Sequence, residues 1–460
     1  MAKAHVLFWF DVEDCSVPQS DDAAKRIAQI LSEHGIRGTM KVVGQKARVL
    51  RDRVRYDVID ALGRHDIGYH SNWHGLRPQV AEYLAPLGWE AGVAEFDHRE
   101  GPGLADVAAL LGQHPVCYGQ PGPNWAPHVF PVLRRWGVPA YISGFGYVSI
   151  DAQPFWYGGV LNTSHMAGPQ GRRHLGLNFE LGSDGALAGH VRAFDAAVES
   201  LGDAGGLITV MNHPCTLVLE EWFSTRLKPA HLTEAGYRDF DGFVRHVLGS
   251  DGVEVIDAPR LLELYPDAAR GRALGRDELL ALARAVGGEV VWQELDGAVL
   301  SAAEVFGLLV RALAGAADGA GGESLEWQYL DGPAQRLESG DTEFSIKWEV
   351  FVQAVKAAAS FCATHGRVPD EVRMGSRRVF PGDFLATAAE AAATLLGTGR
   401  SPERVTILSA TDRVADYVDE EAARGGWASA MLPDGFRAPA LVELARLQAW
   451  TLKPAIPRDG

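Results

Sequence analysis

The sequence has little cysteine, no long apolar run and no excess of positive charge. Four cysteines in 460 residues do not form a disulfide framework. The apolar run near the amino terminus, Val6 to Phe10, has five residues. It is shorter than the apolar core of a signal peptide, and much shorter than the about 20 residues of a membrane span. These absences predict a cytoplasmic protein that does not cross a membrane.

Acidic residues outnumber basic residues by 59 to 43, which gives a formal net charge of −16. This balance argues against nucleic acid or an anionic membrane as the main partner. Hydrophobic residues make up 47% of the chain and charged residues 22%, an ordinary globular mixture that predicts little disorder. The length has room for two or three domains, and a homo-oligomer is compatible with this composition.

The first 268 residues alternate short apolar strands with amphipathic helices. Helical spacing is clear at 23–36, 104–113 and 129–138. The expected strands lie at 5–10, 38–44, 66–71, 115–122, 140–143, 206–213 and 253–257. This alternation predicts an α/β fold with a parallel sheet, either open or closed into a barrel.

The composition changes near residue 269, where the chain becomes rich in alanine and leucine. Two segments, beginning near 298 and 377, look alike. Each has a short apolar strand, a turn and an acidic residue that opens a helix. We therefore expect a smaller, mainly helical α+β domain over 269–460, built from a duplicated helix-strand-helix module.

The sequence His70-Ser71-Asn72-Trp73-His74 follows a predicted strand. Histidines four residues apart can point the same way and bind one metal ion. The alternative is a pair of hydrogen-bonded loop histidines.

Three carboxylates, Asp11, Glu13 and Asp14, stand at the end of the first predicted strand. The carboxyl ends of parallel strands are where such folds keep their active sites. Crowded anions repel one another unless a cation or a proton lies among them. One carboxylate and two histidines would leave open positions for water and substrate on a metal ion. The alternative is a cluster that caps the next helix, although one acid would be enough for that. His213 also follows a late predicted strand, which makes it a further candidate.

These motifs in this order resemble the polysaccharide deacetylases of carbohydrate esterase family 4, the NodB-homology family. The D-V-E-D sequence resembles the subgroup that contains cytoplasmic peptidoglycan deacetylase and metal-free allantoinase. The resemblance covers about residues 1–260. It implies a distorted (β/α)7 TIM-like barrel and a divalent metal ion, most often zinc, held by one aspartate and two histidines.

The resemblance also implies roles for individual residues. Asp11 would be the general base and His213 the general acid. His70 and His74 would bind the metal, with Asp14 preferred as the carboxylate ligand and Glu13 as the alternative. The loop that matches the family's R-x-P-G motif would contact substrate through Tyr118, Gln120, Pro121, Gly122 and Trp125.

The sequence departs from the family pattern in one important place. Gly119 or Gln120 stands where the family has an arginine that orients the catalytic aspartate. An altered substrate or a lost activity would each account for this departure.

The leading interpretation is a metal-dependent hydrolase that removes N-acetyl or O-acetyl groups from an acetylated sugar or glycan. One alternative is a cyclic amidohydrolase of the metal-free allantoinase type. Another is a carbohydrate-binding protein with a decayed site. The segment around His365 to Pro369 resembles pseudomurein-binding repeats, which implies a glycan-binding role for the second domain; a structural or dimerisation module is the alternative.

Overall fold

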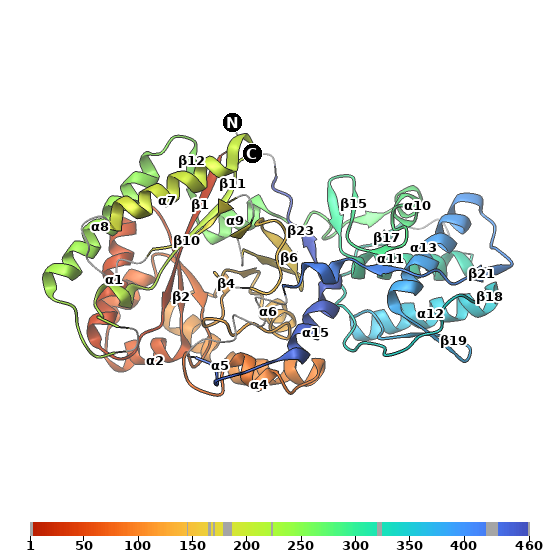
Figure 1. Ribbon diagram of the computed structural model, residues 1–460, viewed down its shortest axis with the longest axis horizontal. Coiled ribbons are helices and arrows are strands. Elements are labelled where there is room, and N and C mark those ends of the chain that lie inside the picture. The colour runs from red at the N-terminus through yellow and green to blue at the C-terminus, as the bar shows by residue number, and fades with distance from the viewer. Residues whose placement is uncertain are drawn as a thin grey trace.

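The structure is a computed structural model. It describes residues 3–144, 146–163, 167–168, 171–177, 186–221, 224–319, 324–419 and 431–458. Figure 1 shows a curved sheet with surrounding helices and, beside it, a mainly helical region formed by later parts of the chain. Within the described ranges, no helix is both long and apolar enough to cross a lipid bilayer.

An 11-stranded sheet organises the first part of the chain, and its strands run in the order β10-β11-β1-β2-β3-β4-β5-β7-β6-β23, with β12 also paired to β1. Pairing is parallel from β10 through β7 and antiparallel at β6 and β23. The strands are β1 (Ala4–Val12), β2 (Thr39–Val42), β3 (Asp66–Tyr69), β4 (Cys117–Tyr118), β5 (Ala140–Tyr141), β6 (Phe155–Tyr157), β7 (Val160–Asn162), β10 (His174–Gly176), β11 (Gly206–Asn212), β12 (Val253–Ile256) and β23 (Lys453–Pro454). The predicted α/β class is confirmed, and the sheet curls into a half-barrel with an antiparallel edge.

Helices follow most of the parallel strands and cover the outside of the sheet (Figure 1). They are α1 (Pro18–Glu33), α2 (Gly44–Asp52), α3 (Tyr56–Leu62), α4 (Val80–Leu84), α5 (Trp89–Leu111), α6 (Val129–Trp136), α7 (Ala186–Leu201), α8 (Ala230–Gly249) and α9 (Ala258–Leu264). Helix α5 ends at Gly112 and α6 at Gly137, both with a left-handed backbone that a residue without Cβ adopts at low cost.

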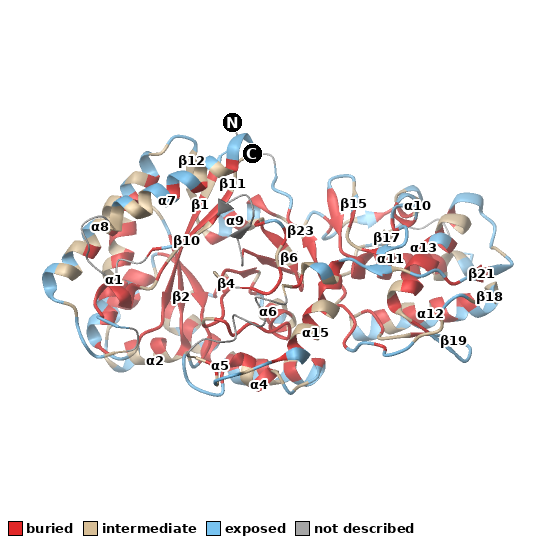
Figure 2. Cartoon of the chain, in the orientation of Figure 1, coloured by how far each residue is buried: buried red, intermediate tan, exposed pale blue. Residues whose placement is uncertain are grey.

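Alternation along β1 decides which side chains face the helices and which face the inside of the curve. Phe8 and Phe10 meet α8, where their rings lie 6.3 Å from Phe243 and 5.9 Å from Phe240. Leu7 and Trp9 point the other way, into a core with side chains from β4, β5 and β11. Figure 2 shows β1 and β2 buried along almost all of their length. Because successive side chains alternate, Asp11 and Glu13 share the inner side with Trp9.

The later region contains two helix-hairpin-helix units. The first is α10 (Arg276–Ala285), β15 (Gln293–Leu295), β16 (Ala298–Leu300) and α11 (Ala302–Ala317). The second is α12 (Trp348–His365), β19 (Val372–Met374), β20 (Arg377–Val379) and α13 (Pro381–Thr398). Glu304 and Asp383 lie in the first turns of α11 and α13, at the same place in each unit.

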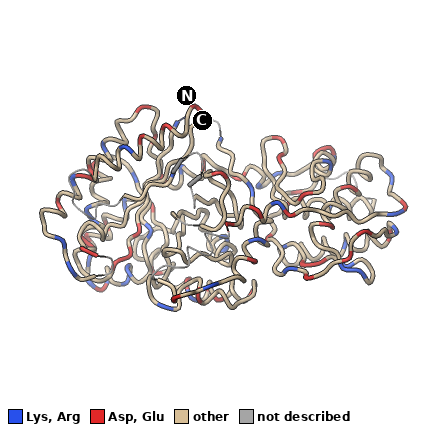
Figure 3. Tube along the Cα trace, in the orientation of Figure 1, with Lys and Arg blue, Asp and Glu red and all other residues tan. Residues whose placement is uncertain are grey.

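The chain then returns to the first sheet through α15 (Pro439–Gln448) and β23. Strand β23 pairs with β6, and the Lys453 ammonium lies 2.8 Å from Asp267 and 3.0 Å from Glu304. Residues near 453 therefore join the sheet of the first part to the first helical unit, and the division at 268 stays a prediction. Acidic and basic residues are interspersed over both parts (Figure 3).

Candidate active site

Three sequence motifs meet at the carboxyl ends of neighbouring strands. Asp11 and Glu13 lie at the end of β1, His70 directly follows β3 and His213 directly follows β11. Strand β1 pairs in parallel with β11 on one side and with β2 on the other, and β3 is the next strand. The parallel sheet therefore brings these residues to one edge, as the sequence predicted.

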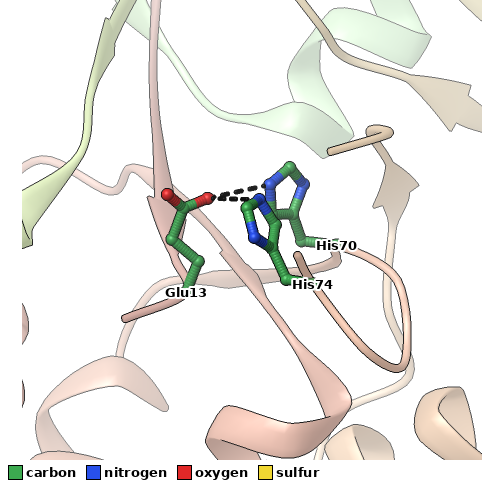
Figure 4. Close-up of side chains that lie close together, drawn as sticks. All are labelled: Glu13, His70 and His74. Atoms are coloured by element: carbon green, nitrogen blue, oxygen red, sulfur yellow. Dashed lines mark hydrogen bonds and ion pairs between the residues drawn. The ribbon is translucent and has the colours of Figure 1, made fainter. Parts of the chain in front are cut away.

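Glu13, His70 and His74 form a buried cluster of possible metal ligands. The Oε2 atom of Glu13 lies 3.2 Å from Nε2 of His70 and 2.9 Å from Nε2 of His74. Figure 4 shows both imidazole rings turned toward this single carboxylate oxygen. One ligand atom from each of the three lies within 4.8 Å of the others, close enough for all three to reach one ion.

The hydrogen bond on the far side of His70 defines which nitrogen faces the cluster. Nδ1 of His70 lies 2.7 Å from the carbonyl oxygen of Gly119. A carbonyl oxygen only accepts, so Nδ1 carries a proton, and in the neutral imidazole the lone pair of Nε2 faces Glu13. Burial lowers the pKa of His70, which favours this neutral form. A lone pair facing a carboxylate oxygen is unfavourable unless a positive charge lies between them. The donor set therefore fits a cation.

The carboxylate of Asp14 lies outside this cluster, which corrects the expected preference for Asp14 over Glu13. Its Oδ1 accepts hydrogen bonds from Oγ of Ser16 at 2.8 Å and from Oγ of Ser20, in the first turn of α1, at 2.5 Å. The reason is again alternation, because residue 14 falls on the opposite side from residues 11 and 13. Asp14 therefore accepts from serine hydroxyls near the start of α1, but it does not cap the helix, whose N-cap Val17 has no side-chain hydrogen bond.

Asp11 and His213 form a second pair beside Glu13, with 3.4 Å between Oδ2 and Nε2. Burial alone would raise the pKa of Asp11, but His70, Lys41 and His213 together hold it well below its ordinary value. Burial would lower the pKa of His213, but Glu13 and Asp11 raise it. The pair therefore joins an ionised carboxylate to an imidazole that retains its proton readily.

Lys41, which the sequence reasoning missed, also contacts Asp11. Its Nζ lies 2.8 Å from Oδ1 of Asp11 and donates to the carbonyl oxygen of Ile142 at 3.0 Å. A signal was available, because a lysine in the middle of the apolar strand 39–42 needs a buried partner.

Most of the predicted substrate-binding side chains in the loop after β4 are buried and do not face the cluster of Glu13, His70 and His74. Tyr118 faces the helices and packs against Tyr69 and Phe96, with ring centroids 5.8 and 5.9 Å away. The Gln120 side chain is buried, and its Oε1 accepts from the hydroxyl of Tyr141. The expectation that Tyr118 and Gln120 contact substrate is therefore corrected. Both side chains are buried on the helix side of the sheet and do not face the inside of its curve.

The same loop holds the remaining three predicted residues. Trp125 is buried against Tyr147 and Phe130, so its expected substrate contact is also corrected. Pro121 lines a cavity of about 180 Å³ together with Trp73 of the histidine motif. Gly122 has a φ of +46°, a left-handed conformation that favours glycine.

Comparison with known proteins gives only distant likenesses. No family model and no curated protein matches the sequence. A Mycobacterium smegmatis protein assigned as a polysaccharide deacetylase is 17% identical over 57% of this chain and 90% of its own, with a TM-score of 0.39. A family 4 carbohydrate esterase from Streptomyces lividans is 16% identical over 55% and 92%, with a TM-score of 0.30. The 4-alpha-glucanotransferase from Thermococcus litoralis is 13% identical over 57% and 40%, with a TM-score of 0.40. These values are too low to carry a conclusion about function.

Proposed function

We propose that this protein is a metal-dependent hydrolase that removes N-acetyl or O-acetyl groups from an acetylated sugar or glycan. The observation that carries this proposal is the single oxygen of Glu13 between two histidine nitrogens, with the Asp11–His213 pair beside it. A ligand set and an acid–base pair in one buried site are the parts that metal-assisted amide hydrolysis needs.

Zinc is the ion we propose for the cluster. Two imidazole nitrogens and one carboxylate oxygen form a mixed set that suits zinc, and three protein ligands leave a position for substrate or water. The hydrogen bond from His70 to the Gly119 carbonyl is the kind of outer contact that fixes a ligand's tautomer and orientation.

The residues of the chain divide the proton transfers between them. A divalent ion bound there would polarise the acetyl carbonyl and lower the pKa of water. The ionised carboxylate of Asp11 would accept the proton of the attacking water. The protonated imidazole of His213 would donate a proton to the leaving nitrogen, or to the leaving oxygen of an ester. The products would be acetate and the free amine or hydroxyl.

The proposed substrate class is supported by the motif resemblance and by an exposed aromatic ring at the site. Trp73, between the two histidines of the motif, is 49% exposed. Such a ring can stack on a sugar. We extend the proposal to the duplicated helical region, as a glycan-binding part of the same protein.

The test combines metal content with acetate release. Purified wild type, Glu13→Gln and the double variant His70→Ala with His74→Ala would be examined by elemental analysis, and acetate release would be measured on N-acetylglucosamine oligomers. We expect about one ion per chain in wild type, no ion in the variants, and acetate only from wild type. A wild type that takes up no zinc, cobalt or nickel would favour the metal-free amidohydrolase. Metal binding and glycan binding without acetate release would favour a binding protein.

A further inference from the structure

We propose that Lys41 is the positioning residue for Asp11, and that the absence of a side chain at Gly119 leaves room for its ammonium and for the Ile142 carbonyl oxygen that the ammonium contacts. The inference rests on the proposed function for its catalytic consequence. Its structural content concerns only how the carboxylate of Asp11 is held.

Three contacts fix the Lys41 ammonium, two from β1 and one from the chain just beyond β5. Nζ lies 2.8 Å from Oδ1 of Asp11 on β1, donates to the Ile142 carbonyl at 3.0 Å just beyond β5, and lies 3.8 Å from the centre of the Trp9 ring. The lysine side chain is 1% exposed, so water does not compete for these contacts. The ammonium group of Lys41 therefore has a defined position, unlike the ammonium of a flexible lysine at the surface.

The contacts of Asp11 show what the ammonium does. Oδ1 meets Lys41, while Oδ2 lies 3.4 Å from Nε2 of His213. Each oxygen of the carboxylate therefore faces a different basic side chain. Oδ1 also lies 3.5 Å from Nδ1 of His70, but the proton on that nitrogen is already donated to the carbonyl oxygen of Gly119. No other cationic side chain of the described residues lies within ion-pair distance of Oδ1, apart from these histidines.

Two glycines provide the space along the lysine side chain. A Cβ at Gly68 would lie 2.7 Å from Cγ of Lys41. A Cβ at Gly119 would collide with the Ile142 carbonyl oxygen and with Nζ of Lys41, and would lie 3.1 Å from Cδ of Lys41. Such distances are incompatible with the present packing. Position 119 is one of two where the family motif implies an arginine, and any side chain there would compete with the ammonium. A lysine on β2 therefore supplies from a neighbouring strand the charge that the loop after β4 lacks.

The test separates positioning from simple support of the fold. Lys41→Met would be compared with wild type and with Lys453→Met, another buried lysine in an ion-pair cluster, remote from the site. For Lys41→Met we expect kcat for acetate release to fall by about 100-fold or more, with KM changed by less than about threefold. We also expect zinc to bind at least as tightly as in wild type, by competition with a chelating dye, because a nearby positive charge has been removed. Lys453→Met should change neither kcat nor zinc affinity.

Several results would overturn the inference. A Lys41→Met enzyme with kcat within about threefold of wild type would do so, as would parallel losses of zinc affinity and kcat, which indicate a structural support. If this variant does not fold, Lys41→Gln, which keeps a polar side chain but removes the charge, should give the same pattern, with Lys453→Gln as its control.

Crystal structures of wild type and Lys41→Met test the role of Lys41 independently of the proposed enzyme activity. The Asp11 carboxylate should lose its orientation in the variant whatever the substrate is, and an unmoved carboxylate would refute the inference even in an active deacetylase. Absence of acetate release from wild type rejects the proposed function alone.

Discussion

Glu13 and His74, 61 positions apart in the sequence, lie 2.9 Å apart in the structure, with Oε2 of the carboxylate facing Nε2 of the imidazole. The contact is buried, and the same oxygen faces His70. Glu13 and Asp14 were both candidates for the carboxylate of this cluster. The alternation of side chains along β1 places Glu13 in the cluster and Asp14 outside it.

Glu13 and Asp14 should therefore differ sharply in their effect on metal binding. Glu13→Gln removes a donor atom from the cluster, so zinc affinity should fall by more than the ~10–100-fold that outer residues of metal sites contribute. Asp14→Asn retains the geometry of an acceptor for Ser16 and Ser20, and zinc affinity should stay within about tenfold of wild type. Competition with a chelating dye measures both. Equal losses in the two variants would contradict the assignment of Glu13.

Two tryptophans should separate substrate contact from packing. Trp73 is half exposed, so Trp73→Ala should raise KM for N-acetylglucosamine oligomers while leaving the midpoint of thermal unfolding almost unchanged. Trp125 packs in the core, so Trp125→Ala should reduce the free energy of unfolding by about 3–5 kcal/mol. Steady-state kinetics and denaturant titration of both variants give the comparison. A Trp73→Ala enzyme with an unchanged KM would remove this ring from the substrate site.

Asp66 should make the stability of the fold depend on pH in the acidic range. Burial raises the pKa of Asp66 from its ordinary 3.8 to about 6, against the opposing effect of Arg37. A raised pKa means that the folded state favours the protonated carboxyl. Its stabilising contribution is therefore complete below pH 3.8 and is lost as the pH rises through 6.

The comparison for this effect is Asp66→Asn, which cannot ionise. Between pH 4 and pH 7, wild type should lose up to about 3 kcal/mol of unfolding free energy relative to this variant. Urea titrations across the pH range measure the difference. A constant difference, or one that grows in favour of wild type with rising pH, would contradict the raised pKa.

Lys453 should contribute strongly to stability. Its ammonium lies between Asp267 and Glu304, and all three side chains are largely buried. Lys453→Met leaves two carboxylates without their counter-charge, which should cost about 3–5 kcal/mol of unfolding free energy. Lys3→Met is the control, because Lys3 is 61% exposed in its pair with Glu254 and should cost less than about 1 kcal/mol. Equal losses of unfolding free energy in Lys453→Met and Lys3→Met would mean that burial does not strengthen the contribution of the Lys453 ion pairs.

The sequence allowed the fold class and the meeting of the motifs to be predicted, because strand-end position depends on local apolar patterns. The choice between Glu13 and Asp14 was also within reach, since alternation from Trp9 places residue 13 inside and residue 14 outside. The same alternation applied to β4 would have turned Tyr118 toward the helices.

Other features required the pairing of strands in three dimensions. The contact between Lys41 and Asp11 depends on the lateral neighbour of β1 and on empty space at Gly119. Neither follows from the spacing of residues along the chain. The return of β23 to the sheet was likewise outside local patterns, since a strand of two residues has no periodicity to detect.

The pairing of β23 with β6 has a consequence for folding during synthesis. Every other strand of that sheet lies before residue 257, so a ribosome can complete all of them while β6 still has an unpaired edge. Open edges of this kind invite association with other chains. In the nascent protein the edge of β6 therefore stays exposed until residues 453 and 454 have emerged from the ribosome. In a fragment cut near residue 268, this edge would stay unpaired permanently.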